Sequence, residues 1–314
     1  MVRQYATGML ILTLAVSRFC NAEEETPPPP HEWLDRWHVE LSDSMDTSAQ
    51  WLDRFFALEG SEESTSARAK GRIRLGWSPR SRDLSDVSVR FRINVTLPAL
   101  KDRVDLILSD NEEDLNEQAL ESNRPVTLNE QDSANLAFRF RASEDAKISY
   151  RIGGGRRDQL FVKTRYRDSV NFDNRNQIIY DAEVYYYTRD QLGAELGFTW
   201  QLQNVDKSFS RVSNRFYYRD ISKDWRWRHE FHHIKQTGPK SATILSLFTE
   251  GLTEPSYQVE EVYTSLRWRT NPLREWLYFE VEPYLTWLRE EDFDTSYGVA
   301  FRVEVFYGGY TTSL

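Results

Sequence analysis

From residue 69 to residue 307 the chain is a series of short stretches in which every second residue is apolar. The clearest stretch runs from Val87 to Leu97, where apolar side chains alternate with serine, arginine, asparagine and threonine. A β-strand points successive side chains to opposite faces, so this stretch has one apolar face and one charged face. Soluble sheets alternate in the same way. A membrane-spanning barrel is distinguished from a soluble sheet by the number of such stretches and by the N-terminal segment that precedes them.

Fourteen such stretches follow one another, and each has about the length of a tilted strand that crosses a bilayer, roughly 9–11 residues. They cover residues 70–77, 86–97, 102–109, 134–142, 147–154, 159–167, 176–187, 192–203, 210–219, 224–233, 241–249, 258–269, 275–288 and 295–307. The stretches 102–109 and 241–249 are the weakest, which leaves twelve strands as an alternative. The pattern predicts an all-β fold, an antiparallel transmembrane β-barrel of 12–14 strands over residues 69–307.

An even number of strands places both ends of the barrel on the same side of the membrane, which we expect to be the periplasm. The connections 97–102, 143–147 and 270–275 then become periplasmic turns, and they carry the turn formers Pro98, Asp145, Asn271 and Pro272. The longest connection, 110–133, falls outside the cell, where such barrels keep their long loops. Gly153-Gly154-Gly155 is expected to form a hairpin turn with positive φ.

Residues 1–22 have the features of a secretory signal peptide. Arg3 supplies the positive start, residues 9–16 form an apolar core, and Cys20-Asn21-Ala22 is a small-x-small cleavage site. A lipid anchor at Cys20 is the alternative, which Arg18 and Phe19 disfavour because those sites normally hold small residues. The core is too short to span a bilayer as a helix.

Residues 23–68 are expected to form a Pro-rich spacer, with Pro27–Pro30, and then amphipathic periplasmic helices. Trp33, Leu34, Trp37, Leu41 and Met45 form one stripe, and a second stripe is predicted to begin a new helix that Thr47 and Gln50 cap. The candidate docking residues of this segment are Trp33, Trp37, Trp51 and Phe55. Such a surface must be buried. It would cap the periplasmic mouth, lie on the inner leaflet of the outer membrane, or dock a periplasmic protein.

Composition agrees with a secreted barrel. The mean hydropathy is −0.65 and the formal net charge is −9, and the acidic balance argues against a nucleic-acid partner. Aromatic residues gather near the ends of the stretches, as the interfacial girdles of membrane barrels do. These are Trp77, Trp200, Trp225, Trp268, Trp287, Tyr166, Tyr186, Tyr218 and Tyr297. We therefore expect the bacterial outer membrane as the location, with its lipid and lipopolysaccharide as partners.

The last stretch alternates apolar residues up to Phe306 and Tyr307 and resembles the C-terminal strand that the barrel assembly machinery recognises. It departs from that pattern in its tail, residues 308–314. With the segment Trp276–Pro283 and the basic strand that ends at Leu97-Pro98, the chain resembles a broad family of uncharacterised outer-membrane barrel proteins from Gram-negative bacteria. The resemblance implies the barrel architecture and carries over no catalytic residue.

The charged face of the stretches points into the predicted lumen. Its basic wall comprises Arg72, Arg74, Arg90, Arg92, Arg139, Arg141, Arg151, Lys163, Arg165 and Arg167, which Asp105 alone opposes in the first six stretches. Its acidic wall comprises Asp181, Glu183, Glu195, Glu230, Glu261, Glu280, Glu282 and Glu304. Two interpretations remain open. Water fills the lumen and the two walls select among small polar solutes, or the walls pair and plug the barrel.

The first part of the outer loop 110–133 holds a cluster of acidic residues, namely Asp110, Glu112, Glu113, Asp114, Glu117 and Glu121. They would bind a divalent cation or bridge to lipopolysaccharide, although no EF-hand spacing is present and a solvated loop is the favoured interpretation.

His229, His232 and His233 raise the alternative of a lipid-modifying, phospholipase-like enzyme with a Ser-His-Asn set. Alternation places His229 and His233 on the apolar face and His232 on the other, and no serine-hydrolase motif surrounds Ser241 or Ser246. A metal site would need a third converging ligand. The sequence therefore favours a small-solute pore or envelope scaffold without catalysis, metal or cofactor, with a barrel subunit docked through residues 31–60 as a further alternative.

Overall fold

The computed structural model describes residues 32–56, 68–84, 86–97, 103–109, 135–143, 145–155, 159–206 and 208–308. The predicted signal peptide, most of the Pro-rich spacer, the outer loop 110–133 and most of the C-terminal tail lie outside the described residues. In the part that is described, no helix has the length and apolarity needed to cross a membrane.

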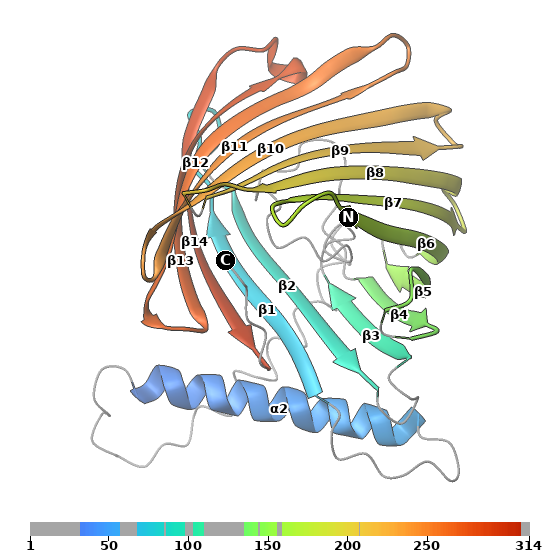
Figure 1. Ribbon diagram of the computed structural model, residues 1–314, viewed down its shortest axis with the longest axis vertical. Coiled ribbons are helices and arrows are strands. Elements are labelled where there is room, and N and C mark those ends of the chain that lie inside the picture. The colour runs from blue at the N-terminus through green and yellow to red at the C-terminus, as the bar shows by residue number, and fades with distance from the viewer. Residues whose placement is uncertain are drawn as a thin grey trace, which may run out of the picture. The chain divides into compact units, whose positions relative to one another are not determined.

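Fourteen strands form one closed antiparallel barrel (Figure 1). Their bounds are β1 Arg68–Trp77, β2 Val87–Thr96, β3 Val104–Ser109, β4 Asn135–Arg141, β5 Ile148–Gly155, β6 Gln159–Asn171, β7 Asn176–Tyr187, β8 Gln191–Gln203, β9 Phe209–Arg219, β10 Asp224–Gly238, β11 Ser241–Leu252, β12 Gln258–Arg274, β13 Leu277–Leu288 and β14 Ser296–Tyr307. The prediction of a barrel is confirmed with its upper strand number, and both weak stretches, now β3 and β11, are strands. A short 3₁₀ helix, η4 (Arg289–Glu291), lies between β13 and β14.

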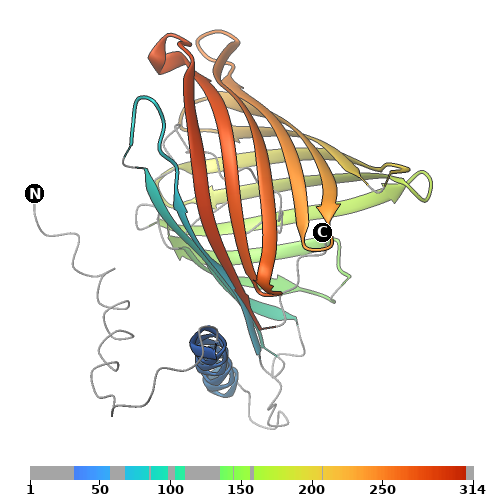
Figure 2. The ribbon, with the colours of Figure 1, turned by 90° about the vertical axis from the view of Figure 1, so that its left-hand side faces the viewer.

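Each strand pairs with the next, and the last strand closes the barrel on the first (Figure 2). The closing register runs from Gly71 opposite Tyr307 to Trp77 opposite Phe301. Closure leaves no free sheet edge, which is a condition for a sheet that lies in lipid.

The two faces of the wall differ as the alternation predicts. On β2 the side chains of Val87 and Val89 are 69% and 57% exposed, whereas Arg92, on the opposite face, is 4% exposed. The apolar side chains therefore point outward and the charged ones inward. Several predicted girdle residues lie at strand ends and contact other rings, whereas Tyr166 and Trp268 lie well inside β6 and β12. Trp77 stacks on Phe301 at 5.9 Å between ring centroids, and Tyr218 lies 5.3 Å from Trp225.

Two predicted turns are wrong. Gly153-Gly154-Gly155 is not a hairpin turn, because all three residues belong to β5. Glycine is needed at position 153 for space, since a Cβ there would lie 2.3 Å from the carbonyl oxygen of Leu136 and 2.7 Å from the Phe161 ring. The predicted turn 270–275 is also too early: β12 continues to Arg274 across a register shift after Thr270.

The predicted pair of helices is a single helix, α2 (Glu32–Phe56). Thr47 and Gln50 lie inside it and therefore do not cap a second helix. Trp33 and Trp37 are exposed. The side chains of Trp51 and Phe55 lie outside the described residues. Ser42–Leu314 forms one compact unit, which contains the barrel and the second half of α2.

Candidate pore-lining charge network

The inward-facing strand positions carry many more basic than acidic side chains. The basic set includes Lys70, Arg72, Arg74, Arg90, Arg92, Arg139, Arg141, Arg151, Lys163, Arg165, Arg167, Arg211, Arg215, Arg226, Arg228, Arg267, Arg269 and Arg302. The acidic set includes Asp105, Asp181, Glu183, Glu195, Glu230, Glu250, Glu261, Glu280, Glu282 and Glu304. Every member of the predicted basic and acidic walls is in these sets. The register explains why, since residues that pair across neighbouring strands share one face.

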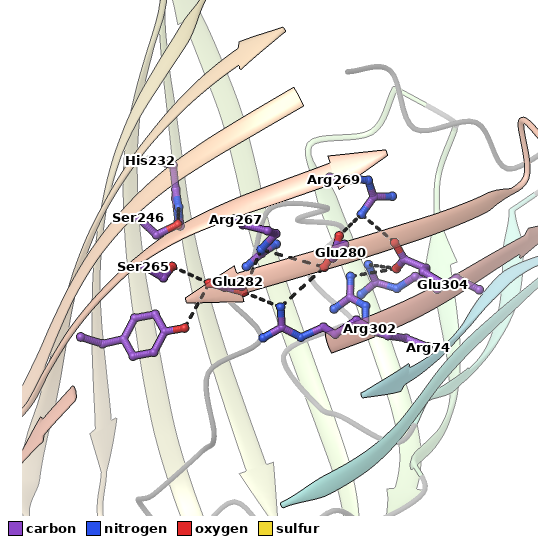
Figure 3. Close-up of polar contacts among 12 residues, drawn as sticks. Arg74, His232, Ser246, Ser265, Arg267, Arg269, Glu280, Glu282, Arg302 and Glu304 are labelled. Atoms are coloured by element: carbon purple, nitrogen blue, oxygen red, sulfur yellow. Dashed lines mark hydrogen bonds and ion pairs between the residues drawn. The ribbon is translucent and has the colours of Figure 1, made fainter. Parts of the chain in front are cut away.

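The most extensive cluster joins β12, β13, β14 and β1 around three glutamates (Figure 3). Glu282 is fully buried and accepts hydrogen bonds from Arg267 Nε at 3.0 Å and from Arg302, as well as from the hydroxyls of Tyr263 and Ser265. One carboxylate thus bridges two guanidinium groups on two different strands.

Glu280 and Glu304 extend this cluster to the closing seam. Arg269 Nη1 lies 2.5 Å from Glu280 Oε1 and 2.7 Å from Glu304 Oε2. The other oxygen of Glu304, Oε1, lies 2.8 Å from Arg74 Nη2 and 3.6 Å from Arg72 Nη1, and both arginines belong to β1. The first and last strands are therefore joined by ion pairs as well as by backbone hydrogen bonds.

A second cluster joins β5, β6, β7, β8 and β9. Arg165 Nη2 lies 2.6 Å from Asp181, whose other oxygen is 3.5 Å from Arg215. Arg215 also pairs with Glu195. Glu183, the remaining carboxylate, pairs with Arg151 and lies 3.8 Å from Lys163 Nζ and 4.0 Å from Arg165 Nε.

Two smaller clusters repeat the arrangement of one carboxylate between two arginines. On β3, Asp105 lies 3.0 Å from Arg139 and 2.9 Å from Arg141. On β11, Glu250 lies 2.8 Å from Arg226 and 2.9 Å from Arg228.

The charged walls are expected from the sequence to face each other across the lumen, and the ion pairs of the described residues do not follow that division. They join neighbouring or near-neighbouring strands along the wall, so acidic and basic residues assigned to different walls meet side by side. Arg151 with Glu183 is one example and Arg74 with Glu304 is another. The physical reason is distance, because adjacent strands are only about 4.8 Å apart.

Glu230 and His232 form a further contact on the inward face. His232 is buried, and its ring lies 3.0 Å from Ser246 Oγ through Nδ1 and 3.3 Å from Glu230 through Nε2. Glu261 is buried at the position opposite Glu250. Arg90 and Arg167 stand opposite Arg74 and Asp181 in the register.

Sequence reasoning missed Arg211, Glu250 and Arg269. The alternation through Arg215 and Arg267 places Arg211 and Arg269 on the inward face, and that signal was available in the sequence. Glu250 was missed because the predicted strand ended at residue 249, whereas β11 continues to Leu252.

The outward histidines form two separate polar pairs. His229 Nδ1 lies 2.7 Å from Asn214 Oδ1, and His233 Nδ1 lies 3.0 Å from Ser210 Oγ. A Ser-His-Asn set needs one histidine between the amide and the serine. Here the amide and the serine contact different rings four residues apart, about 13 Å along an extended strand. These pairs therefore do not form a catalytic set. Among the described residues, no three His, Cys, Asp or Glu side chains are grouped to hold a metal ion.

No protein-family model matches the chain, and no curated protein matches it. Solved structures that are similar to it are outer-membrane proteins. The outer membrane channel DcaP of Acinetobacter baumannii has a TM-score of 0.47 at 6% identity, over 77% of this chain and 97% of that one. OmpT of Vibrio cholerae has a TM-score of 0.49 at 8% identity, over 77% and 99%. OprB of Pseudomonas putida has a TM-score of 0.44 at 10% identity, over 77% and 92%. The barrel assignment rests on the strand pairing of this chain itself.

Proposed function

We propose that this chain is an outer-membrane pore for small solutes and that its lumen favours anions. The observation that carries the proposal is the charge of the inward face, where arginine and lysine outnumber aspartate and glutamate although the whole chain is acidic, with a formal net charge of −9. A lumen wall with an excess of one sign of charge raises the local concentration of ions of the opposite sign.

The membrane location is supported by the outward face. Large apolar side chains on strands around the barrel are exposed, among them Leu160 at 67%, Ile152 at 52% and Leu247 at 48%. A closed barrel whose outer surface is apolar is stable in lipid, because every strand edge is paired and the exposed surface matches acyl chains.

The shared carboxylates support an ordered, charged wall. Each of Asp105, Glu250, Glu282 and Glu304 holds at least two arginines by ion pairs. Several donors around one acceptor fix the guanidinium groups along the wall. In this arrangement the carboxylates orient the cations and leave the wall with a positive formal charge.

The test is single-channel recording in planar bilayers. Purified protein is expected to give conductance steps and, under a KCl gradient, a reversal potential that shows preference for chloride. Absence of steps at every voltage would remove the pore and leave an envelope scaffold. A preference for potassium would contradict the anion-selective lumen.

A matched pair of variants locates the selectivity. Lys70 belongs to the inward-facing series of β1, and Lys240 is an exposed residue of the turn between β10 and β11. At 10 mM salt, where the Debye length is about 30 Å, Lys70→Gln should lower the chloride-to-potassium permeability ratio roughly two- to threefold. Lys240→Gln should change it little. Equal effects of the two substitutions would place the selectivity outside the lumen.

A further inference from the structure

A polar pair of side chains interrupts the apolar outer face of the barrel on β9 and β10. Outward residues of these two strands stand opposite one another, and from the extracellular end the pairs are Tyr218 with Trp225, Phe216 with Trp227, Asn214 with His229 and Val212 with Phe231. The third pair is polar and partly exposed. Its Asn214 Oδ1 and His229 Nδ1 atoms lie 2.7 Å apart.

The depth of this pair places it among acyl chains. Tyr218 and Trp225 are girdle residues at strand ends, and Asn214 lies four residues from Tyr218 along β9. Four residues of strand rise about 13 Å, and a tilt of about 40° converts this length to a depth of about 10 Å. The apolar band of a membrane barrel is about 25 Å tall, so the pair lies well inside it. Water is not available there to its polar atoms.

The contact between the two side chains leaves one donor group and one acceptor group unused. A neutral imidazole has one N–H and one bare nitrogen, and an amide has one oxygen and one NH₂ group. If Nδ1 of His229 donates to the amide oxygen, the Asn214 NH₂ group and the bare Nε2 remain. If the amide is turned round and donates to Nδ1, Nε2–H and the amide oxygen remain. In the described part of the chain, neither remaining group has another hydrogen-bond partner.

Other polar groups on this part of the outer face form hydrogen bonds within the wall. Thr249 stands opposite His229, and its hydroxyl donates to the carbonyl oxygen of Glu261 at 3.2 Å. The hydroxyl of Thr264 on β12 also donates to a backbone carbonyl oxygen at 3.2 Å. Phe216, whose ring centroid lies 6.0 Å from that of His229, is an exposed apolar side chain. The Asn214–His229 pair therefore differs from its surroundings, because it carries a donor and an acceptor that the wall does not use.

We propose that this surface of β9 and β10 is the contact between two copies of the chain. A twofold axis along the membrane normal brings the Asn214–His229 pair of one copy to the depth of the same pair in the other copy. The donor of each pair then meets the acceptor of the other, and two hydrogen bonds form in a medium without water. Acyl chains have neither a donor nor an acceptor. A surface with one of each is complementary to itself, so a second copy supplies what this surface lacks.

Charges at the two ends of this surface do not oppose the contact. Toward the outside Lys223 Nζ lies 2.5 Å from Asp220, and toward the periplasm Lys235 Nζ lies 3.6 Å from Asp206. Each end thus carries one positive and one negative charge, so two copies do not repel each other there. The inference rests on the membrane location of the barrel and does not depend on conduction through the lumen.

Distances between nitroxide labels test the contact. Cys20 is the only cysteine, so a Cys20→Ser background accepts single labels. Ser222→Cys lies in the exposed turn between β9 and β10. Leu84→Cys, at a residue that is 72% exposed, lies in the loop between β1 and β2, on the far side of the closed strand order. The full chain is reconstituted in vesicles with a large excess of lipid, and distances between labels of different copies are measured by double electron–electron resonance.

We expect two spins per assembly and a shorter distance between labels at position 222 than at position 84. Absence of a dipolar signal at position 222 would overturn the inference. An assembly of three or more spins would also overturn it, because a closed twofold contact holds only two copies. A distance at position 84 that is equal to or shorter than that at position 222 would place the contact on another face.

Substitutions of the polar pair test the role of its hydrogen bonds. Asn214→Leu with His229→Leu removes donor and acceptor and should lower the association constant about tenfold. Thr164→Leu, which removes a polar group from an exposed outward position of β6, should leave it unchanged. Exchange of the two residues, Asn214→His with His229→Asn, keeps one donor and one acceptor and should retain most of the association.

Tryptophan fluorescence in urea shows for each variant whether the barrel is folded. Unchanged association in the folded double leucine variant would contradict a hydrogen-bonded contact. Equal loss of association in the folded exchanged variant and in the double leucine variant would contradict it as well. A loss in Thr164→Leu as large as in the double leucine variant would mean that association depends on the polarity of the whole outer face.

Discussion

The carboxylate of Glu282 should be among the most important single groups for the stability of the barrel. It is fully buried and accepts from two guanidinium groups and two hydroxyls. In Glu282→Gln the charge disappears while Arg267 and Arg302, 1% and 4% exposed, keep theirs. Removal of one partner from a buried ion pair costs about 3–5 kcal/mol. Glu280 lies 3.6 Å from Arg302 and 3.9 Å from Arg267 and compensates in part, so we expect the lower end, about 3 kcal/mol.

The measurement is urea unfolding of the reconstituted barrel, followed by tryptophan fluorescence. Glu290→Gln is the matched control, because it removes the same charge from an exposed position on η4 and should change the unfolding free energy by less than about 0.5 kcal/mol. A double-mutant cycle of Glu282→Gln with Arg302→Gln should show a coupling energy above about 1 kcal/mol. If Glu282→Gln matches the control and the cycle shows no coupling, the network does not support the wall.

Three further substitutions test other parts of the structure. Gly153→Ala should destabilise the barrel by about 1–3 kcal/mol, because its Cβ meets the backbone of Leu136, whereas Gly154→Ala, whose nearest contact is 3.4 Å, should be near neutral in the same urea assay. Hydrogen bonds from the N–H groups of Arg175 and Asn176 and from the Asn176 side chain lower the pKa of Asp173. These hydrogen bonds therefore stabilise the turn between β6 and β7 fully at pH values above the ordinary pKa of aspartate. The stabilisation is lost as the pH falls through the lowered pKa of Asp173. The protection factor of the Asn176 amide, that is, its exchange rate relative to the intrinsic rate at the same pH, should fall across that window in the wild type but not in Asp173→Asn, and equal profiles would refute the assignment. Arg80→Gln should free the loop between β1 and β2, since Arg80 lies 2.6 Å from Glu291, and limited proteolysis should cut that loop faster than in Arg175→Gln.

The strands and the faces could be predicted from the sequence because alternation is a local signal. One side chain of known direction fixes the direction of every other side chain in that strand. This is why Arg72, Arg139 and Glu280 were assigned to the inward face correctly, and why the limits of β7, Asn176–Tyr187, agree with the predicted stretch.

The partners of those residues could not be predicted, because they depend on how the strands are staggered and which strands meet. The prediction of two opposed walls assumes that strands far apart in the chain are also far apart in space. Closure of the barrel instead brings Arg74 on β1 within 2.8 Å of Glu304 on β14. The packing around each residue could not be predicted either. Three consecutive glycines are typical of a turn, but Gly153 lies in a strand where neighbouring atoms leave no room for a Cβ. The capping pattern at Thr47 predicts the start of a second helix. The single helix α2 instead continues through this position, where Met45 and Ala49 pack against the barrel, and a local capping pattern contains no information about that packing.

The seam between β1 and β14 has a consequence for biogenesis. Arg74 and its carboxylate acceptor Glu304 are separated by 230 positions, so the arginine is synthesised long before its acceptor exists. A prematurely terminated polypeptide without β14 would keep an open sheet edge and would lack the acid that the finished molecule supplies to Arg72 and Arg74. Such a product should remain available to envelope proteases, so that insertion of the final strand acts as a built-in check that translation has been completed.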